Sequence, residues 1–334
     1  MSPSGVKVSP VGIGFFVFIV VVVFYLTFNH FGKNDVSISV QDNHVSMKAL
    51  LIASIDVAMR GGKMVKEVKE SADLGEESKG ETKEGVNDPL TMGDKLSHQA
   101  MSTSFARGFP NVPLISEEND GKPFAMNLPP LPTTNSEVDK IVGSSDEVVQ
   151  AEDITIWIDP LDATKEYTED LLQYVTTMVC IAVKGQPIIG VIHKPFSNET
   201  YWAWFDHGTN VKEKKDVGNE GEHRIIVSRS HAGTVKETAQ KAFGEDVVVV
   251  PAGGAGYKSL ALYNGQASVY LHTTLIKKWD ICAGNAILNT SGGKMTTLSG
   301  SRIDYSRSGD PKNDGGLLAA LHNHEQYLQK LGYA

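Results

Sequence analysis

The stretch that decides the fold reads Thr155-Ile156-Trp157-Ile158-Asp159-Pro160-Leu161-Asp162-Ala163-Thr164. The apolar run that begins at Ile154 predicts a buried strand, which Pro160 ends because proline has no N–H for a sheet. The strand delivers Asp159 and Asp162, and carboxylates this close repel each other unless a cation lies between them. Oxygen ligands favour a hard ion such as Mg²⁺. The alternative interpretation is a turn with an aspartate at both ends.

Two other acidic motifs favour the metal interpretation. Glu117 and Glu118 end the short apolar run Leu114-Ile115-Ser116, and Asp280 opens a predicted helix in Lys277-Lys278-Trp279-Asp280-Ile281-Cys282-Ala283-Gly284. Taken singly, Glu117 could be a solvated loop acid, and Asp280 could be a helix cap, since aspartate is a preferred capping residue. The three motifs in this order predict one shared metal site.

Together the three motifs resemble the signatures of the inositol monophosphatase superfamily. The resemblance covers roughly residues 40–330 and implies a layered αβαβα sandwich of the inositol monophosphatase/fructose-1,6-bisphosphatase type. It also implies a Mg²⁺-dependent, lithium-sensitive phosphomonoesterase. The continuation Lys165-Glu166-Tyr167-Thr168-Glu169 resembles the branch that cleaves 3′-phosphoadenosine 5′-phosphate to AMP and phosphate. Ala163 and an amino-terminal apolar segment resemble the Golgi-resident members of that branch, which support sulfation.

The resemblance also implies roles for single residues. Two or three Mg²⁺ ions are expected: one held by Glu117, Asp159 and the Leu161 carbonyl, a second by Asp159, Asp162 and Asp280. Asp94 with Glu117 would position a further ion or the attacking water, and Thr164 would assist by hydrogen bonding towards Asp94. Two-metal sites stabilise attacking and leaving oxygens in this way.

Substrate contacts are expected in three segments. The backbone N–H groups of Ala163 and Thr164 would face the phosphate at a helix start, although most relatives have glycine where Ala163 stands. The remaining contacts are Ser228, Arg229, Ser230 and His231, and Gly254, Gly256 and Lys258 in a glycine-rich segment. That segment could equally be a turn packed on a strand, and a lone histidine such as His231 is more often structural.

Composition limits the classes of partner. The chain has 334 residues, 41% of them hydrophobic, which suffices for a large core and suggests two domains. The net charge of −9 argues against nucleic acid as a partner. The expected partner is a small nucleotide, and a homodimer is compatible with the sequence. The rival functions are an inositol phosphate phosphatase with the same metal site and a catalytically silent, membrane-tethered binding protein.

The amino terminus predicts a membrane anchor. Residues 8–32 contain no Lys, Arg, Asp or Glu, and residues 12–28 are almost wholly apolar. As a helix these span roughly 25 Å, near the lower limit for crossing a bilayer. A cleaved signal peptide is the alternative, with Ser37-Ile38-Ser39 a weak cleavage candidate. We expect an uncleaved signal anchor at about 11–28, and a single-pass type II protein in the Golgi membrane with a lumenal catalytic domain.

The rest of the chain divides at polar segments. We expect a tail and anchor in 1–32, a metal-binding α+β domain in 33–205, a linker loop in 206–223 and a smaller α/β domain in 224–334. Helices are predicted over 40–64 and 94–105, an antiparallel meander over 174–205, and alternating strands and helices after 224. We expect 66–88 to be a charged loop and 119–153 a surface insertion.

Cysteines and glycosylation motifs bear on the compartment. Cys180 and Cys282 are the two cysteines, and we expect both to be small buried hydrophobic residues. Asn198-Glu199-Thr200 and Asn289-Thr290-Ser291 are glycosylation motifs, of which Asn198 is the better candidate because it lies in a polar turn.

Overall fold

The computed structural model describes residues 43–71, 73–81, 85, 87–118, 126–214, 223–229 and 235–332. The predicted anchor of residues 11–28 and the expected contacts Ser230 and His231 lie outside these ranges. Within them, no helix combines the length and the apolar character needed to cross a membrane. Residues 40–334 form one compact unit.

Two long helices pack against each other at the amino-terminal side of this unit. Helix α2 (Met47–Glu70) begins at Ser46, whose hydroxyl accepts the Ala49 N–H at 3.0 Å, and α3 is Met92–Gly108. The helix predicted over 40–64 continues beyond that range to Glu70. A Cβ on Gly61 would lie 2.6 Å from the Met101 sulfur, so glycine is needed where α2 approaches α3.

The first sheet has six strands and confirms the predicted meander. Its order is β10-β9-β8-β7-β6-β4, with β6 to β10 antiparallel and β4 parallel to β6. The strands are β4 (Leu114–Ser116), β6 (Ile154–Asp162), β7 (Thr176–Val183), β8 (Gln186–Lys194), β9 (Glu199–Trp204) and β10 (Gly208–Thr209). Every residue of β6 is buried, as predicted. The expectation that Pro160 ends the strand is wrong, because β6 continues to Asp162 across a register irregularity between Asp159 and Asp162.

The second sheet has five strands in the order β12-β11-β13-β17-β15. Strand β11 runs parallel to β12 and β13, and β17 is antiparallel to β13 and β15, so the predicted alternation of strands and helices is confirmed. The elements are β11 (Arg224–Ser228), α6 (Val235–Phe243), β12 (Val248–Ala252), α7 (Ala255–Ala261), β13 (Val269–His272), α8 (Lys278–Thr290), β15 (Lys294–Thr296), β17 (Leu317–Ala320) and α9 (His324–Leu331).

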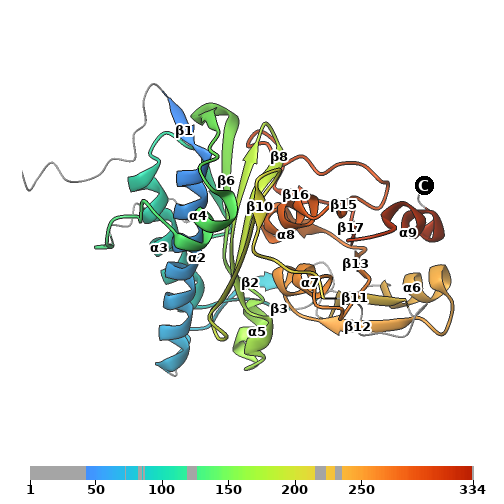
Figure 1. The fold of residues 1–334 in the computed structure, drawn as a ribbon. Coiled ribbons are helices and arrows are strands. Elements are labelled where there is room, and N and C mark those ends of the chain that lie inside the picture. Colours follow the sequence, from blue (N-terminus) through green and yellow to red (C-terminus); the bar gives the residue numbers. More distant parts are fainter. Residues whose placement is uncertain are drawn as a thin grey trace, which may run out of the picture. The chain divides into compact units, whose positions relative to one another are not determined.

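The helices and sheets stack in five layers (Figure 1). Helices α2 and α3 cover one face of the six-stranded sheet, α7 and α8 lie between the two sheets, and α6 and α9 cover the outer face of the second sheet. One apolar cluster runs through the middle layer and joins both sheets, from Trp157 through Ile281 to Leu317. The predicted αβαβα sandwich is confirmed.

Smaller elements close the ends of these layers. The 66–88 segment was expected to be a loop. Its first residues instead form the last turn of α2, and β2 (Glu77–Glu81) pairs with β3 (Asn87–Leu90) in an antiparallel hairpin. The other short elements are β1 (His44–Ser46), α4 (Ser136–Val142), β5 (Val148–Gln150), α5 (Thr164–Thr168), β14 (Ile276–Lys277), β16 (Lys312–Asn313) and the 3₁₀ turns Ala151–Asp153 and Leu172–Tyr174. Three of these, α4, β5 and the turn Ala151–Asp153, lie in the 119–153 segment, whose described part is therefore partly regular.

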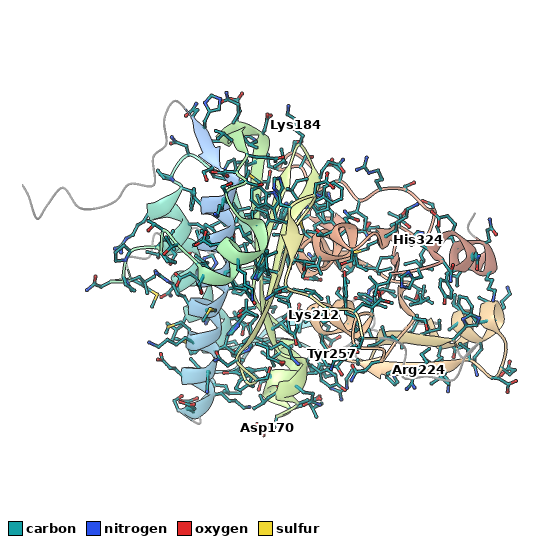
Figure 2. The ribbon with its side chains drawn as sticks, in the orientation of Figure 1. Asp170, Lys184, Lys212, Arg224, Tyr257 and His324 are labelled. Carbon is teal, nitrogen blue, oxygen red and sulfur yellow. A yellow bond between two sulfur atoms is a disulfide. The ribbon has the colours of Figure 1, made fainter. Side chains whose placement is uncertain are left out.

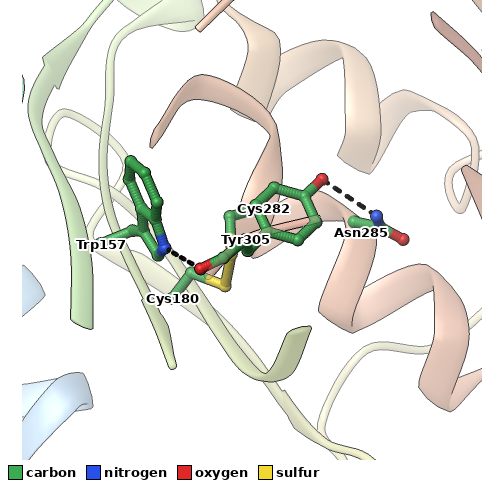
Figure 3. Close-up of a disulfide and its surroundings, with 5 residues drawn as sticks. All are labelled: Trp157, Cys180, Cys282, Asn285 and Tyr305. Atoms are coloured by element: carbon green, nitrogen blue, oxygen red, sulfur yellow. Dashed lines mark hydrogen bonds between the residues drawn. A yellow bond between two sulfur atoms is a disulfide. The ribbon is translucent and has the colours of Figure 1, made fainter. Parts of the chain in front are cut away.

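The two cysteines form a disulfide, contrary to the expectation of free thiols. Cys180 on β7 is bonded to Cys282 on α8, 102 residues later (Figure 3). Cys180 is paired in the sheet with Trp157, whose indole N–H donates to the Tyr305 carbonyl at 2.9 Å. The bond therefore ties the six-stranded sheet to the helix that carries Asp280. Spacing along the chain gave no sign of this contact between the layers.

The acidic motifs meet at one end of the six-stranded sheet. In Figure 2, Lys184, in the turn between β7 and β8, and Asp170, just after α5, lie at opposite ends of this sheet. Strand β6 delivers Asp159 and Asp162 at the end marked by Asp170, immediately before α5.

Buried His193 gives the fold a dependence on pH. It accepts or donates a 2.9 Å hydrogen bond with Thr200, and burial lowers the pKa of its imidazole to about 4. Because the folded pKa lies below the unfolded value, its neutral form stabilises the protein above about pH 6.5, and this contribution is lost as the pH falls towards 4. Between pH 7 and pH 5, His193→Gln should lose about 2 kcal/mol less free energy of unfolding than the wild type. Urea unfolding at both pH values measures this, and equal losses would contradict it.

Candidate active site

Three acids from separate elements converge at the end of the sheet. Glu117 follows β4, Asp159 lies in β6, and Asp280 is in the first turn of α8. One carboxylate oxygen from each lies within 4.8 Å of the others. The parallel pairing of β4 with β6 places the first two together, and the Glu117 N–H donates to the Ile158 carbonyl at 3.3 Å.

The cluster carries more negative than positive charge. Burial, followed by repulsion from Glu117 and Asp162, raises the pKa of both Asp159 and Asp280 well above the ordinary range of an aspartate. Among the described residues, the buried Asp159 Oδ1 has no hydrogen-bond partner. Buried carboxylates are normally hydrogen-bonded, ion-paired or bound to a metal. An all-carboxylate donor set with a free buried oxygen fits a hard divalent cation such as Mg²⁺.

Asp280 both takes part in capping α8 and belongs to the acidic cluster. Its Oδ2 accepts the backbone N–H of Lys277 at 3.1 Å, which is a capping interaction at the start of α8. The same side chain contributes an oxygen to the three-carboxylate cluster. The cap therefore fixes the orientation of the carboxylate towards Glu117 and Asp159.

Asp162 is the expected ligand that the structure holds differently. Its two oxygens accept the backbone N–H groups of Ala255 and Gly256 at 3.0 and 2.9 Å, and the Thr176 hydroxyl donates to it at 2.9 Å. It is not one of the three residues of the cluster. Burial raises the pKa of Asp162, and the neighbouring Lys258 opposes this. Asp162 therefore anchors α7 beside the cluster, and its role as a metal ligand stays a prediction.

Lys79 of the β2–β3 hairpin supplies positive charge to the acidic cluster. Its ammonium group lies 3.0 Å from the Glu117 carboxylate and also contacts Glu118. Burial lowers the pKa of Lys79, but Glu117 and Glu118 outweigh this and raise it above that of an ordinary lysine. Sequence reasoning missed this residue because it lies in a charged segment that was expected to be a loop.

Asp94 and Thr164 form the expected hydrogen bond. The Thr164 hydroxyl lies 2.8 Å from Asp94 Oδ1 and 3.1 Å from the Leu161 carbonyl. Asp94 Oδ2 accepts the N–H and the hydroxyl of Thr91 at 2.7 and 2.6 Å. Burial raises the pKa of Asp94 to about 6, so its carboxylate is a stronger base than a solvated aspartate.

A cavity of about 460 Å³ opens onto these residues. Ten of the expected site residues line it: Glu117, Asp159, Leu161, Asp162, Ala163, Thr164, Ser228, Gly254, Lys258 and Asp280. Asp94, Arg229 and Gly256 do not. The lining also contains residues that sequence reasoning did not assign to the site, among them Lys79, Glu118, Tyr270, His272, Lys277 and Trp279. The motif Lys277-Lys278-Trp279 adjoins Asp280, and that adjacency was the available signal.

Ala163 occupies a backbone conformation that favours glycine. It precedes α5 with φ 72° and ψ 45°, in the left-handed region. An alanine there costs roughly 1–2 kcal/mol more than in the right-handed helical conformation. Asn, Asp or Gly would adopt this geometry more readily than alanine. Ala163 is thus a strained residue between the acids of β6 and Thr164.

The expected phosphate contacts are already engaged within the protein. Lys258 is buried, its ammonium group donates to the Gly254 carbonyl at 2.6 Å, and it faces Asp162. The Arg229 guanidinium lies 2.6 Å from Glu169 and 3.2 Å from Glu166. A Cβ on Gly256 would lie 2.5 Å from Thr176 Oγ1, so this glycine has a packing reason. Roles for these residues in binding stay predictions.

The sequence matches the model of the inositol monophosphatase family over residues 46–332. The chain belongs to the inositol monophosphatase family. It is 45% identical to inositol monophosphatase 3 of Danio rerio and 44% identical to the Golgi-resident adenosine 3′,5′-bisphosphate 3′-phosphatase of Rattus norvegicus. Each alignment covers 99% of this chain and 98% of the relative. The family predicted from the three motifs is confirmed.

Solved structures of family members share the fold. The suhB protein of Bartonella henselae superposes with a TM-score of 0.61 at 15% identity, covering 85% of this chain and 98% of that one. An inositol monophosphatase from Anabaena gives 0.58 at 18% identity, covering 86% and 96%. The inositol monophosphatase-type fold expected for this chain is therefore confirmed.

Proposed function

We propose that this protein is a Mg²⁺-dependent phosphomonoesterase that hydrolyses adenosine 3′,5′-bisphosphate to AMP and phosphate. The observation that carries the proposal is the convergence of Glu117, Asp159 and Asp280 in one cavity, which Thr164 also lines while its hydroxyl donates to Asp94. The near-full-length similarity to a phosphatase named for this nucleotide supports the substrate.

The acidic cluster would hold the metal. Glu117, Asp159 and Asp280, with Asp162 and the Leu161 carbonyl as further ligands, are the residues proposed to bind two or three Mg²⁺ ions. Bound there, Mg²⁺ would neutralise the phosphate charge and make a coordinated water more acidic.

The Thr164–Asp94 pair would handle the proton of the attacking water. Thr164 Oγ1 lines the cavity while its hydroxyl donates to Asp94 Oδ1, which keeps a lone pair of Oγ1 available to a water in the cavity. As that water loses its proton, the proton passes to Thr164 Oγ1 while the threonine proton moves to Asp94. The raised pKa of Asp94, about 6, suits it to accept this proton near neutral pH.

Similarity alone does not choose between nucleotide and inositol phosphate. The Danio rerio relative named for inositol monophosphate and the rat relative named for the nucleotide are 45% and 44% identical to this chain. Four lysines line the cavity, Lys79, Lys165, Lys258 and Lys277, and those that are not paired with an acid of the protein would offer a contact to a second anionic group. A catalytically silent protein would not explain why Asp159 Oδ1 is buried without a hydrogen-bond partner.

We further propose that the protein resides in the Golgi lumen as a type II protein anchored by residues 11–28. The relatives named Golgi-resident support the compartment. The Cys180–Cys282 disulfide supports an oxidising compartment, since disulfides persist in the secretory pathway and are rare in the cytosol. Asn198, at a turn between β8 and β9, stays the proposed glycosylation site.

Phosphate release from a substrate panel tests the function. With Mg²⁺, residues 33–334 should cleave adenosine 3′,5′-bisphosphate more efficiently than adenosine 3′-phosphate or inositol phosphates. The kcat/KM should be at least about tenfold higher, because an extra charge-assisted contact contributes roughly 1.5–3 kcal/mol. Lithium chloride should inhibit where sodium chloride does not. Preference for inositol 1-phosphate would favour the rival phosphatase, and no turnover of any compound would favour the silent protein.

A further inference from the structure

Lys277 stands out among the cationic side chains of the cavity. Lys79 is paired with Glu117 and Glu118, and Lys258 is held by the Gly254 carbonyl and Asp162. Within the described part of the chain, neither the Lys165 nor the Lys277 ammonium group forms a close ion pair with a carboxylate, although the Lys277 charge interacts electrostatically with Asp280. These two lysines are therefore the cavity cations that keep their charge available to a bound anion.

Trp279 distinguishes Lys277 from Lys165. The Lys277 ammonium lies 5.2 Å from the centroid of the Trp279 ring, within the range of a cation–π contact. Such a contact holds the charge in place without neutralising it. Trp279 itself lines the cavity and packs against the apolar cluster of the middle layer. Among the described residues, no aromatic ring lies beneath the Lys165 ammonium group.

The backbone at Lys277 is also held rigidly. Strand β14 pairs with β16 so that Lys277 lies opposite Lys312, and the next N–H, of Lys278, donates to the Pro311 carbonyl at 2.8 Å. The Lys277 N–H donates to Asp280. The lysine is thus fixed on the same short segment as an acid of the metal cluster, three residues away.

We propose that Lys277, positioned by Trp279, binds the second, non-reacting phosphate of the substrate while the first lies at the acidic cluster. This assignment rests on the proposed function and adds Lys277 to the cationic contacts expected at Arg229 and Lys258. An ammonium ion held over a ring loses less conformational freedom on binding than a free lysine, so it contributes more to affinity. Lys277 is a specificity-determining residue in this arrangement, and Trp279 is a positioning residue.

The test compares adenosine 3′,5′-bisphosphate with adenosine 3′-phosphate in the full protein loaded with Mg²⁺. Lys277→Ala and Lys277→Met, which keeps an unbranched apolar side chain, should lower the ratio of their kcat/KM values by tenfold or more. Lys277→Arg should keep most of it. The affinity for AMP, measured as competitive inhibition, should fall by a similar factor, while inhibition by adenosine should not change. Trp279→Leu should lower the ratio more than Trp279→Phe, which keeps an aromatic ring.

Two lysine variants serve as controls. Lys312→Ala removes an exposed charge opposite Lys277 outside the cavity and should keep the wild-type ratio. Lys165→Ala removes the rival cavity cation and should lower the ratio much less than Lys277→Ala. A drop with Lys165→Ala and none with Lys277→Ala would overturn the assignment. If the wild type itself does not prefer the bisphosphate, the proposed substrate fails. A wild-type preference that survives in both Lys277 variants refutes only the Lys277 assignment.

Discussion

Asp159→Asn should lower kcat/KM by at least about a thousandfold, which corresponds to a loss of about 4 kcal/mol of transition-state stabilisation. The reason is that the substitution removes a negative charge that would hold the metal. The substitution keeps the size of a side chain that is 1% exposed. It also removes repulsion from Glu117, Asp162 and Asp280, which together with burial raises the pKa of Asp159. The melting temperature without Mg²⁺ should therefore be no lower than that of the wild type.

The comparison needs Mg²⁺-dependent phosphate release and thermal unfolding of the same preparations. Asp170→Asn is a suitable control, because this exposed aspartate lies at the same end of the sheet and outside the cavity (Figure 2). It should keep wild-type turnover. Wild-type turnover in well-folded Asp159→Asn would refute the assignment of the cluster as the catalytic metal site.

Removing the disulfide should have the largest effect on stability. A cross-link between residues 102 apart restricts the unfolded chain, and the paired variant Cys180→Ala/Cys282→Ala should lose about 4 kcal/mol of unfolding free energy. Guanidinium unfolding without reductant measures this difference. Dithiothreitol should lower the stability of the wild type towards that of the variant and leave the variant unchanged. Equal stabilities without reductant would show that the cross-link contributes nothing.

The parts of the fold that follow from local pattern could be predicted from the sequence. The apolar run into Asp159 predicts a buried strand, and β6 is buried throughout. The strands after Tyr174 predict a meander because polar turns separate them, and β7 to β9 form one. The acidic cluster could be predicted through the motifs at Glu117 and Asp280, which lie just after β4 and in the first turn of α8.

Features that depend on contacts distant in sequence could not be predicted in this way. Lys79 lies among charges with no apolar alternation, yet pairing in the hairpin brings it to Glu117. Cys180 and Cys282 each lie in an apolar context that fits a free buried thiol equally well. Alanine itself does not indicate the positive φ of Ala163, and the glycine of most relatives at this position was the available signal.

The acidic cluster also has a consequence for the order in which the protein matures. Glu117 and Asp159 come from the first sheet, whereas Asp280 follows most of the second in the chain. During synthesis the first two carboxylates therefore exist for more than a hundred residues of elongation without the third. Cys180 likewise precedes Cys282 by 102 residues. Chains truncated before α8 lack both the third carboxylate and the cross-link, so a ribosome-bound fragment cannot assemble this active site before the helix emerges.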